Sequence, residues 1–128
     1  MPFDNPHQTS FGDLDVLEDA RGRIFTQDRW TKRRFQVDGR LCVVAALSLA
    51  AGSRNFSLPN STERRLTRLL AAQIPPIRPF FKRITLLSAR QRLIRYNDSS
   101  DTSHQEVIAL FDRAIHHLVS EAPTYVSA

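Results

Sequence analysis

The sequence predicts a mostly α-helical fold, a compact bundle of about five helices around a central apolar helix at about 41–51. The central segment, VVAALSLAA, has no polar face and is rich in alanine, which is typical of a helix buried among other helices. Nearer the end of the chain, Val107, Phe111 and Leu118 repeat at helical spacing. A length of 128 residues suffices for one hydrophobic core, so we expect a single helical domain over 13–121.

The first helix is expected at about 13–26, because Leu17 and Ile24 fall at helical spacing and Asp13 is a candidate cap. The preceding residues 1–12 are expected to form a flexible leader. The first fifteen residues are acidic and interrupted by Pro2 and Pro6, so they resemble neither a signal peptide nor a transit peptide.

After the first helix, apolar and polar residues alternate up to Asp38-Gly39, the dipeptide most typical of a two-residue hairpin turn. This pattern predicts a small β-hairpin at about 33–42. The alternative makes Asp38 the N-cap of the central helix. In either case the central helix ends at Gly52, because glycine readily adopts the left-handed conformation found at helix C-termini.

A third helix is expected at about 61–73, with Ser61 as its cap and leucines on its inner face. Three prolines then separate it from a fourth helix at about 84–95. The segment YNDSSDTS that follows has the composition of a turn.

The last helix, at about 104–120, is the clearest amphipathic helix of the chain. Ser103 and Glu106 form an S-x-x-E capping box at its start. Pro123 ends it, and residues 122–128 are expected to form a flexible tail.

The composition restricts the kinds of site that the chain can form. A single cysteine, Cys42, excludes an intramolecular disulfide and any multi-cysteine metal site, and it suits the reducing cytoplasm. The longest apolar run, Leu41 to Gly52, is too short to span a bilayer. The adjacent His116 and His117 diverge on a helix, and the sequence has no phosphate loop or dinucleotide fingerprint. We therefore expect a soluble cytoplasmic protein with no cofactor, no metal site and no membrane association.

The net charge of +5 is distributed in three blocks along the chain. Residues 1–20 contain five acidic residues and no basic ones, residues 21–95 contain 17 basic and three acidic ones, and residues 96–128 contain one basic and five acidic ones. One interpretation is that the acidic ends fold back on the basic middle and neutralise it. The other is that the middle presents a surface for an anionic partner. The candidate residues of that surface are Arg64, Arg65, Arg68, Arg90 and Arg92.

Cys42 has two interpretations. A thiol at a helix N-terminus is activated by the helix dipole, and a cysteine hydrolase would add a histidine base and an orienting group. The available residues are His104, His116, His117, Asn97 and Asp98. However, an unbroken apolar run follows Cys42, and free cysteine is among the most buried residue types. We therefore favour Cys42 as a core residue.

Three further residues are interpreted as structural. Trp30 is expected to anchor the core, with its indole N–H bonded to a nearby carbonyl. Asn97 and Asp98 are expected to form a turn after the fourth helix, because asparagine tolerates left-handed backbone and aspartate accepts backbone N–H bonds.

Four features occur in a defined order: Trp30, the CVVAAL segment that begins at Cys42, the triplet that ends in Asn97-Asp98, and the capped last helix. In this order they resemble a family of uncharacterised small bacterial proteins, common in actinobacteria and their phages and classed as a domain of unknown function. In that family a Gly-Trp closes the first helix, Cys-x-x-Gly-Ala-Leu opens the central one, and Trp-Asn-Asp precedes the last.

The resemblance covers roughly residues 14–120, and the chain departs from the family pattern at Arg29, Ala45 and Tyr96. It implies a helical single domain and a shared set of structural positions, and it implies no activity. Those positions are Trp30, Cys42, Asn97, Asp98, Ser103 and Glu106.

These observations predict a non-enzymatic protein-interaction or regulatory module with an unidentified protein partner. The alternative is a nucleic-acid-associated protein that uses the arginine-rich surface. A helix-turn-helix is not expected, because the loop of about nine residues before the third helix is too long for that motif. A cysteine-dependent hydrolase is the third hypothesis, and formation of a homo-oligomer is left open.

Overall fold

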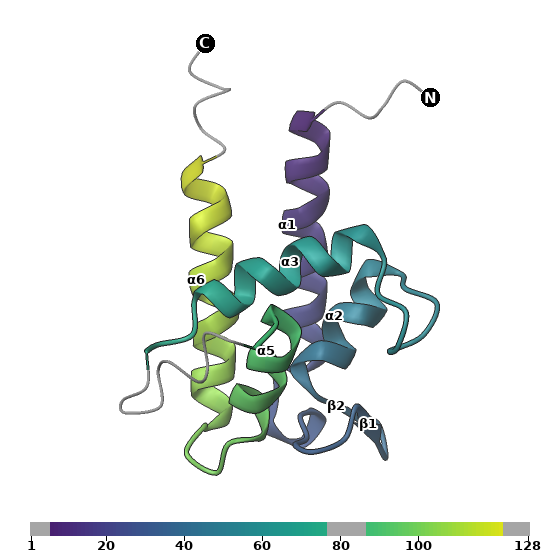
Figure 1. Ribbon diagram of the computed structural model, residues 1–128, viewed down its shortest axis with the longest axis vertical. Coiled ribbons are helices and arrows are strands. Elements are labelled where there is room, and N and C mark those ends of the chain that lie inside the picture. Colours follow the sequence, from purple (N-terminus) through teal and green to yellow (C-terminus); the bar gives the residue numbers. More distant parts are fainter. Residues whose placement is uncertain (1–5, 77–86, 122–128) are drawn as a thin grey trace.

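Five helices and one two-stranded hairpin make up the computed structural model, which describes residues 6–76 and 87–121 (Figure 1). In chain order the elements are α1 (Pro6–Arg23), the 3-10 helix η1 (Gln27–Arg29), β1 (Gln36–Val37), β2 (Arg40–Leu41), α2 (Val43–Ala51), α3 (Ser61–Ala72), α5 (Ala89–Asp98) and α6 (His104–Glu121). The prediction of a mostly helical fold with a small antiparallel hairpin is confirmed.

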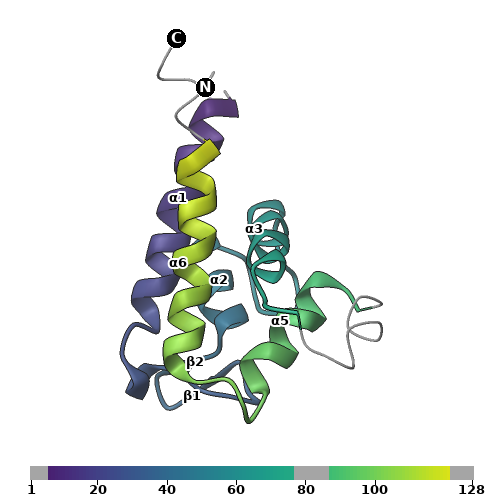
Figure 2. The same cartoon turned by 90° about the vertical axis from the view of Figure 1, so that its left-hand side faces the viewer.

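The two long helices α1 and α6 lie side by side and run antiparallel, as Figure 1 and Figure 2 both show. Helices α3 and α5 contact each other on the other side of the molecule. The short α2 lies between the two pairs and contacts α1, α3 and α5. Because α2 has no polar face, this central position is the one that its sequence predicts.

The hydrophobic core surrounds α2, whose residues from Val43 to Leu47 are completely buried. Fully burying one aliphatic side chain contributes about 1.5–3 kcal/mol, so this cluster outweighs the surface ion pairs as a source of stability. Other elements supply further completely buried side chains to it: Leu17, Ile24, Leu70, Leu93, Val107, Leu110 and Phe111.

Helix α1 begins and ends earlier than the sequence predicts. It starts at Pro6, so residues 6–12 of the expected leader belong to the helix. Proline is favoured in the first turn of a helix, where its missing N–H leaves no intrahelical bond unmade. At the other end, the amides of Ile24 and Phe25 bond to carbonyls three residues back, which tightens the chain and closes the helix at Arg23. Residues 1–5 of the leader and the whole expected tail, 122–128, lie outside the described residues.

The hairpin prediction is confirmed, and the alternative role of Asp38 as a helix cap is wrong. Asp38 and Gly39 have φ values of 48° and 80°, as the two central residues of a type I′ turn require. The N-cap of α2 is Cys42, whose Sγ accepts a hydrogen bond from the Ala45 amide at 3.4 Å. Helix α2 therefore begins two residues later than expected, and it ends at a left-handed Gly52 as predicted.

Helix α3 is capped by Asn60, one residue before the predicted cap Ser61. The Asn60 side chain accepts a hydrogen bond from the Glu63 amide at 2.8 Å and donates one to the carbonyl of Ala51 at 2.8 Å. Glu63 is completely buried, with its Oε1 2.6 Å from the Ser53 hydroxyl. The sole acidic residue of α3 is thus turned inward, away from the arginines of this helix.

The boundaries of α5 differ from the predicted helix at 84–95, of which residues 84–86 lie outside the described residues. Helix α5 begins at Ala89, after Ser88 and Gln91 form a reciprocal capping box. It continues to Asp98, so Asn97 and Asp98 occupy its last turn and the prediction of a separate turn at these residues is wrong.

Helix α6 begins as predicted. The Ser103 hydroxyl accepts a hydrogen bond from the Glu106 amide at 3.2 Å, and the Glu106 carboxylate accepts one from the Ser103 amide at 2.9 Å. The inner face of the helix carries Val107, Phe111 and Ala114, all completely buried.

Substitutions at the cap and on the buried face of α6 should differ in how much they lower the free energy of unfolding. Ser103→Ala removes the cap and should lower the free energy of unfolding by about 1 kcal/mol. Phe111→Ala leaves a cavity and should lower it by on the order of 3 kcal/mol. Denaturant titration followed by circular dichroism measures both, with the exposed Gln105→Ala as a control of little effect. Equal losses at Ser103 and Phe111 would contradict the assignment of the buried face.

Candidate functional site

The five arginines expected to form an anionic-partner surface lie in different environments. Arg64, Arg68 and Arg90 line one pocket of about 180 Å³ between α3 and the start of α5, together with Ser88. We call these four residues the arginine pocket. Arg64 and Arg68 are exposed and lie one turn apart on α3, and the side chain of neither has a hydrogen bond or ion pair with another residue in 6–76 or 87–121.

Arg90 is held in place by two contacts with residues outside the pocket. Its guanidinium donates a hydrogen bond to the carbonyl of Phe56 and lies 5.4 Å from the centroid of the Phe35 ring. Its Nε is buried and has no acceptor in the described part of the chain. The side chain is therefore fixed in position while one of its N–H groups has no partner.

Arg65 belongs to the structural framework. Its Nε and Nη2 donate to the two carboxylate oxygens of Asp13, at 2.9 Å and 2.7 Å, and the Asp13 side chain is only 9% exposed. The hydrogen bonds that Arg65 donates to this carboxylate raise the pKa of Arg65 above its ordinary value. Arg65, which the sequence groups with its neighbours on α3, is thus already paired with a carboxylate. Arg92 also does not line the arginine pocket.

The ion pairs show where the acidic ends of the chain meet its basic middle. Asp13 reaches Arg65, and Asp112 of α6 lies 2.8 Å from Arg21 of α1. Neither acidic residue lines the arginine pocket. Neutralisation of the middle by the ends, the first interpretation of the charge layout, thus describes Arg21, Arg23 and Arg65. Among the residues that the structure describes, it does not extend to Arg64 and Arg68.

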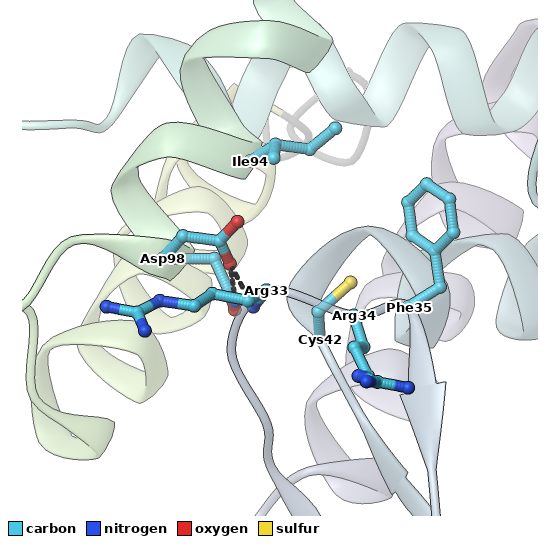
Figure 3. A pocket seen from close by; sticks show the side chains of 7 residues that line it. Arg33, Arg34, Phe35, Cys42, Ile94 and Asp98 are labelled. Atoms are coloured by element: carbon cyan, nitrogen blue, oxygen red, sulfur yellow. Dashed lines mark hydrogen bonds between the residues drawn. The ribbon is translucent and has the colours of Figure 1, made fainter.

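A second pocket of about 170 Å³ lies between the hairpin and α5 (Figure 3). Its lining residues are Arg33, Arg34, Phe35, Cys42, Ile94, Asn97 and Asp98. Figure 3 shows the Cys42 sulfur pointing toward the space between Phe35 and Ile94, while the guanidinium groups of Arg33 and Arg34 extend away from it. We call this the Cys42 pocket, and its inner wall is mainly apolar.

Cys42 has the properties of a core residue more than those of a nucleophile. It is 5% exposed, and burial raises the pKa of its thiol above the ordinary value, which favours the neutral form. None of the residues found to line its pocket is a histidine. His104 instead places Nε2 2.8 Å from the carbonyl of Ile24 and packs against Trp30. Among the residues that the structure describes, His104 is therefore engaged away from the Cys42 thiol.

The other two candidate histidines lie on the outer part of α6. His116 is exposed, and His117 lies 3.1 Å from the carboxylate of Glu121. Within the described ranges, no group of three or more His, Cys, Asp or Glu side chains could hold a metal ion.

Asn97 is the buried residue that joins the wall of the Cys42 pocket to the core. Its Oδ1 accepts hydrogen bonds from the Trp30 indole N–H at 2.7 Å and from the Val43 amide at 3.1 Å. Its Nδ2 donates to the carbonyl of Thr31 at 3.1 Å and to Asp98 at 3.0 Å. The prediction that the Trp30 indole bonds to a carbonyl is confirmed, and the acceptor is a side-chain amide.

Asp98 fixes the chain that leads into the hairpin. Its carboxylate accepts a hydrogen bond from the backbone amide of Arg33 at 2.7 Å, and Arg33 has a left-handed φ of 69°. Non-glycine residues rarely adopt this conformation, so the bond to Asp98 helps to offset its cost. Asn97 and Asp98 are therefore structural, as the sequence predicts, although they act from within a helix.

A family model described as "Family of unknown function (DUF6197)" matches residues 11–117. The chain belongs to this family. Its match includes Trp30, Cys42, Asn97 and the capped start of α6, and the helical fold that the family resemblance implied is observed. No curated protein and no solved structure matches the chain at a significant level. Among the described helices, none is both long and apolar enough to cross a membrane.

The burial of Cys42 predicts how its thiol reacts. A thiol reagent should modify the native protein far more slowly than the unfolded protein, because the sulfur is covered and mainly protonated. Cys42→Ala should lower the free energy of unfolding by on the order of 1–2 kcal/mol through lost packing.

Because folding raises the thiol pKa, the contribution of the thiol to stability is present below the pKa of the unfolded chain and is lost as the pH rises through the folded value. Rapid labelling of the native protein at neutral pH would contradict the core assignment.

Proposed function

We propose that this protein is a non-enzymatic binding module that holds an acidic segment of a partner protein at the arginine pocket. The observation that carries the proposal is the convergence of Arg64, Arg68 and Arg90 on one pocket, with no carboxylate among its described lining residues. Three cations at one concave site create a local field that attracts an anionic group.

The energetics of the free protein support a binding role for these arginines. Like charges one turn apart on a helix, as at Arg64 and Arg68, destabilise it by a few tenths of a kcal/mol. Arg90 and the positive end of the α5 dipole add to the repulsion. Arrangements that cost the fold free energy tend to mark functional positions, and an anion in the pocket would offset this cost.

A protein partner is favoured over nucleic acid for two reasons. Binding to a nucleic acid backbone needs many phosphate contacts, whereas Arg21 and Arg65 are already paired with carboxylates. In addition, α2 is buried and nine residues separate it from α3, so the two helices do not form a helix-turn-helix. A buried free thiol at Cys42 is consistent with function in the reducing cytoplasm, which we include in the proposal.

The proposal predicts that reversing charge at the pocket abolishes partner binding. The double variant Arg64→Glu/Arg68→Glu should retain the fold, because both side chains are exposed. It should lose the protein partners that the wild-type chain retains in a pull-down from nuclease-treated native lysate.

A matched control separates the pocket from net charge. Arg40 and Arg54 are exposed and lie outside the pocket, so Arg40→Glu/Arg54→Glu makes the same change in net charge elsewhere. This variant should keep the partners. Equal retention by the pocket variant, or loss of all partners on nuclease treatment, would contradict a pocket-mediated protein interaction.

A further inference from the structure

The size of the arginine pocket limits what it can hold. Its volume of about 180 Å³ corresponds to about six water molecules at roughly 30 Å³ each. Pockets for drug-sized ligands and cofactors typically measure about 300–1,000 Å³. The arginine pocket is therefore suited to one anionic group with its bridging water, and the remainder of a larger ligand would lie outside it.

The charge of the pocket distinguishes between anionic groups. A carboxylate offers one charge and two acceptor oxygens, whereas a phosphate monoester offers about 1.5–2 negative charges and three acceptor oxygens. Three arginine side chains line the space, and the side chains of Arg64 and Arg68 have no hydrogen-bond or ion-pair partner within the described ranges. Arginine pairs with phosphate through short, charge-assisted and often bidentate hydrogen bonds, so a phosphate monoester satisfies more of these donors than a carboxylate does.

A contact between Arg90 and Phe35 joins the arginine pocket to the Cys42 pocket. Arg90 lines the arginine pocket, Phe35 lines the Cys42 pocket, and the Arg90 guanidinium lies 5.4 Å from the Phe35 ring centroid. The second pocket has about 170 Å³ of space between the apolar side chains of Phe35 and Ile94. One extended segment that crosses Arg90 can thus place an anionic group in one pocket and an apolar side chain in the other.

We infer that the arginine pocket binds the phosphate of a phosphorylated serine or threonine in a partner protein, with a nearby apolar side chain of the same segment in the Cys42 pocket. This inference rests on the proposed function and specifies the chemistry of the partner. The paired pockets favour a peptide over free phosphate, which has nothing to place between Phe35 and Ile94. The same site favours a peptide over single-stranded nucleic acid, because Arg90 and Phe56 already contact the Phe35 ring on which a base would stack.

Titration of the ¹⁵N,¹³C-labelled protein with defined probes tests the inference. The first probes are N-acetyl-phosphoserine amide, N-acetyl-glutamate amide and inorganic phosphate. The second set is a series of peptides in which phosphoserine is joined to leucine through glycine spacers of increasing length, with glycine in place of leucine as the matched control. A short single-stranded oligonucleotide completes the set.

The inference predicts that phosphoserine amide binds about tenfold more tightly than glutamate amide. Arg64→Gln/Arg68→Gln should remove this preference, while Arg40→Gln/Arg54→Gln should leave it unchanged. At one spacer length the leucine peptide should bind at least severalfold more tightly than its glycine control and shift the methyl resonances of Ile94. The melting temperatures of the variants confirm that both remain folded.

Several outcomes would overturn the inference. Equal affinity for phosphoserine and glutamate amides would do so while leaving an acidic protein partner intact as the proposed function. If no leucine peptide, at any spacer length, binds more tightly than inorganic phosphate, the pocket is only a site for free phosphate. Tighter binding of the oligonucleotide would assign the surface to nucleic acid. The absence of binding for every probe would also rule out phosphate recognition. The pull-down from lysate would then test the proposed function independently.

Discussion

The side-chain amide of Asn97 is the interaction on which the arrangement of this small protein depends. It lies in the last turn of α5 and bonds to Trp30, to Thr31 and to the first residue of α2, Val43. A buried polar group left without a partner costs about 1–3 kcal/mol, so a different placement of α5 would leave several groups unsatisfied at once. The amide therefore fixes α5 relative to α2 and the hairpin. Because Arg90 is on α5, the same bonds help to determine where it stands relative to Arg64 and Arg68 on α3.

The charge pattern of the chain divides into a structural part and an unpaired part. Asp13 and Asp112 bring the acidic ends of the chain onto Arg65 and Arg21, and Glu63 is buried beside Ser53. Exposed ion pairs contribute little to stability, but the bidentate pair to the buried Asp13 has the geometry of a stronger contact. What remains is a cationic pocket that no described carboxylate enters. A small apolar pocket lies beside it, and together they define the surface on which both proposals rest.

Local signals in the sequence predicted the features that depend on neighbouring residues. The Asp38-Gly39 turn, the Gly52 terminus and the Ser103–Glu106 capping box each involve residues a few positions apart, and all are observed. The features that could not be predicted depend on distant partners. Local composition predicts a turn at Asn97. Its role inside α5 could not be predicted, because its partners Trp30 and Val43 lie 67 and 54 positions away in the sequence. Arg65 could not be distinguished from Arg64 for the same reason, since Asp13 lies 52 positions away.

A double-mutant cycle on Trp30→Phe and Asn97→Ala tests the central claim most directly. Trp30→Phe keeps an aromatic ring and removes the indole N–H, and Asn97→Ala removes its acceptor. Because each change breaks the same buried bond, the loss in free energy of unfolding for the double variant should be smaller than the sum of the single losses by about 1–2 kcal/mol. Urea titrations of the four proteins measure this coupling. Losses that add to within about 0.5 kcal/mol would show that the two side chains act independently and would contradict the account.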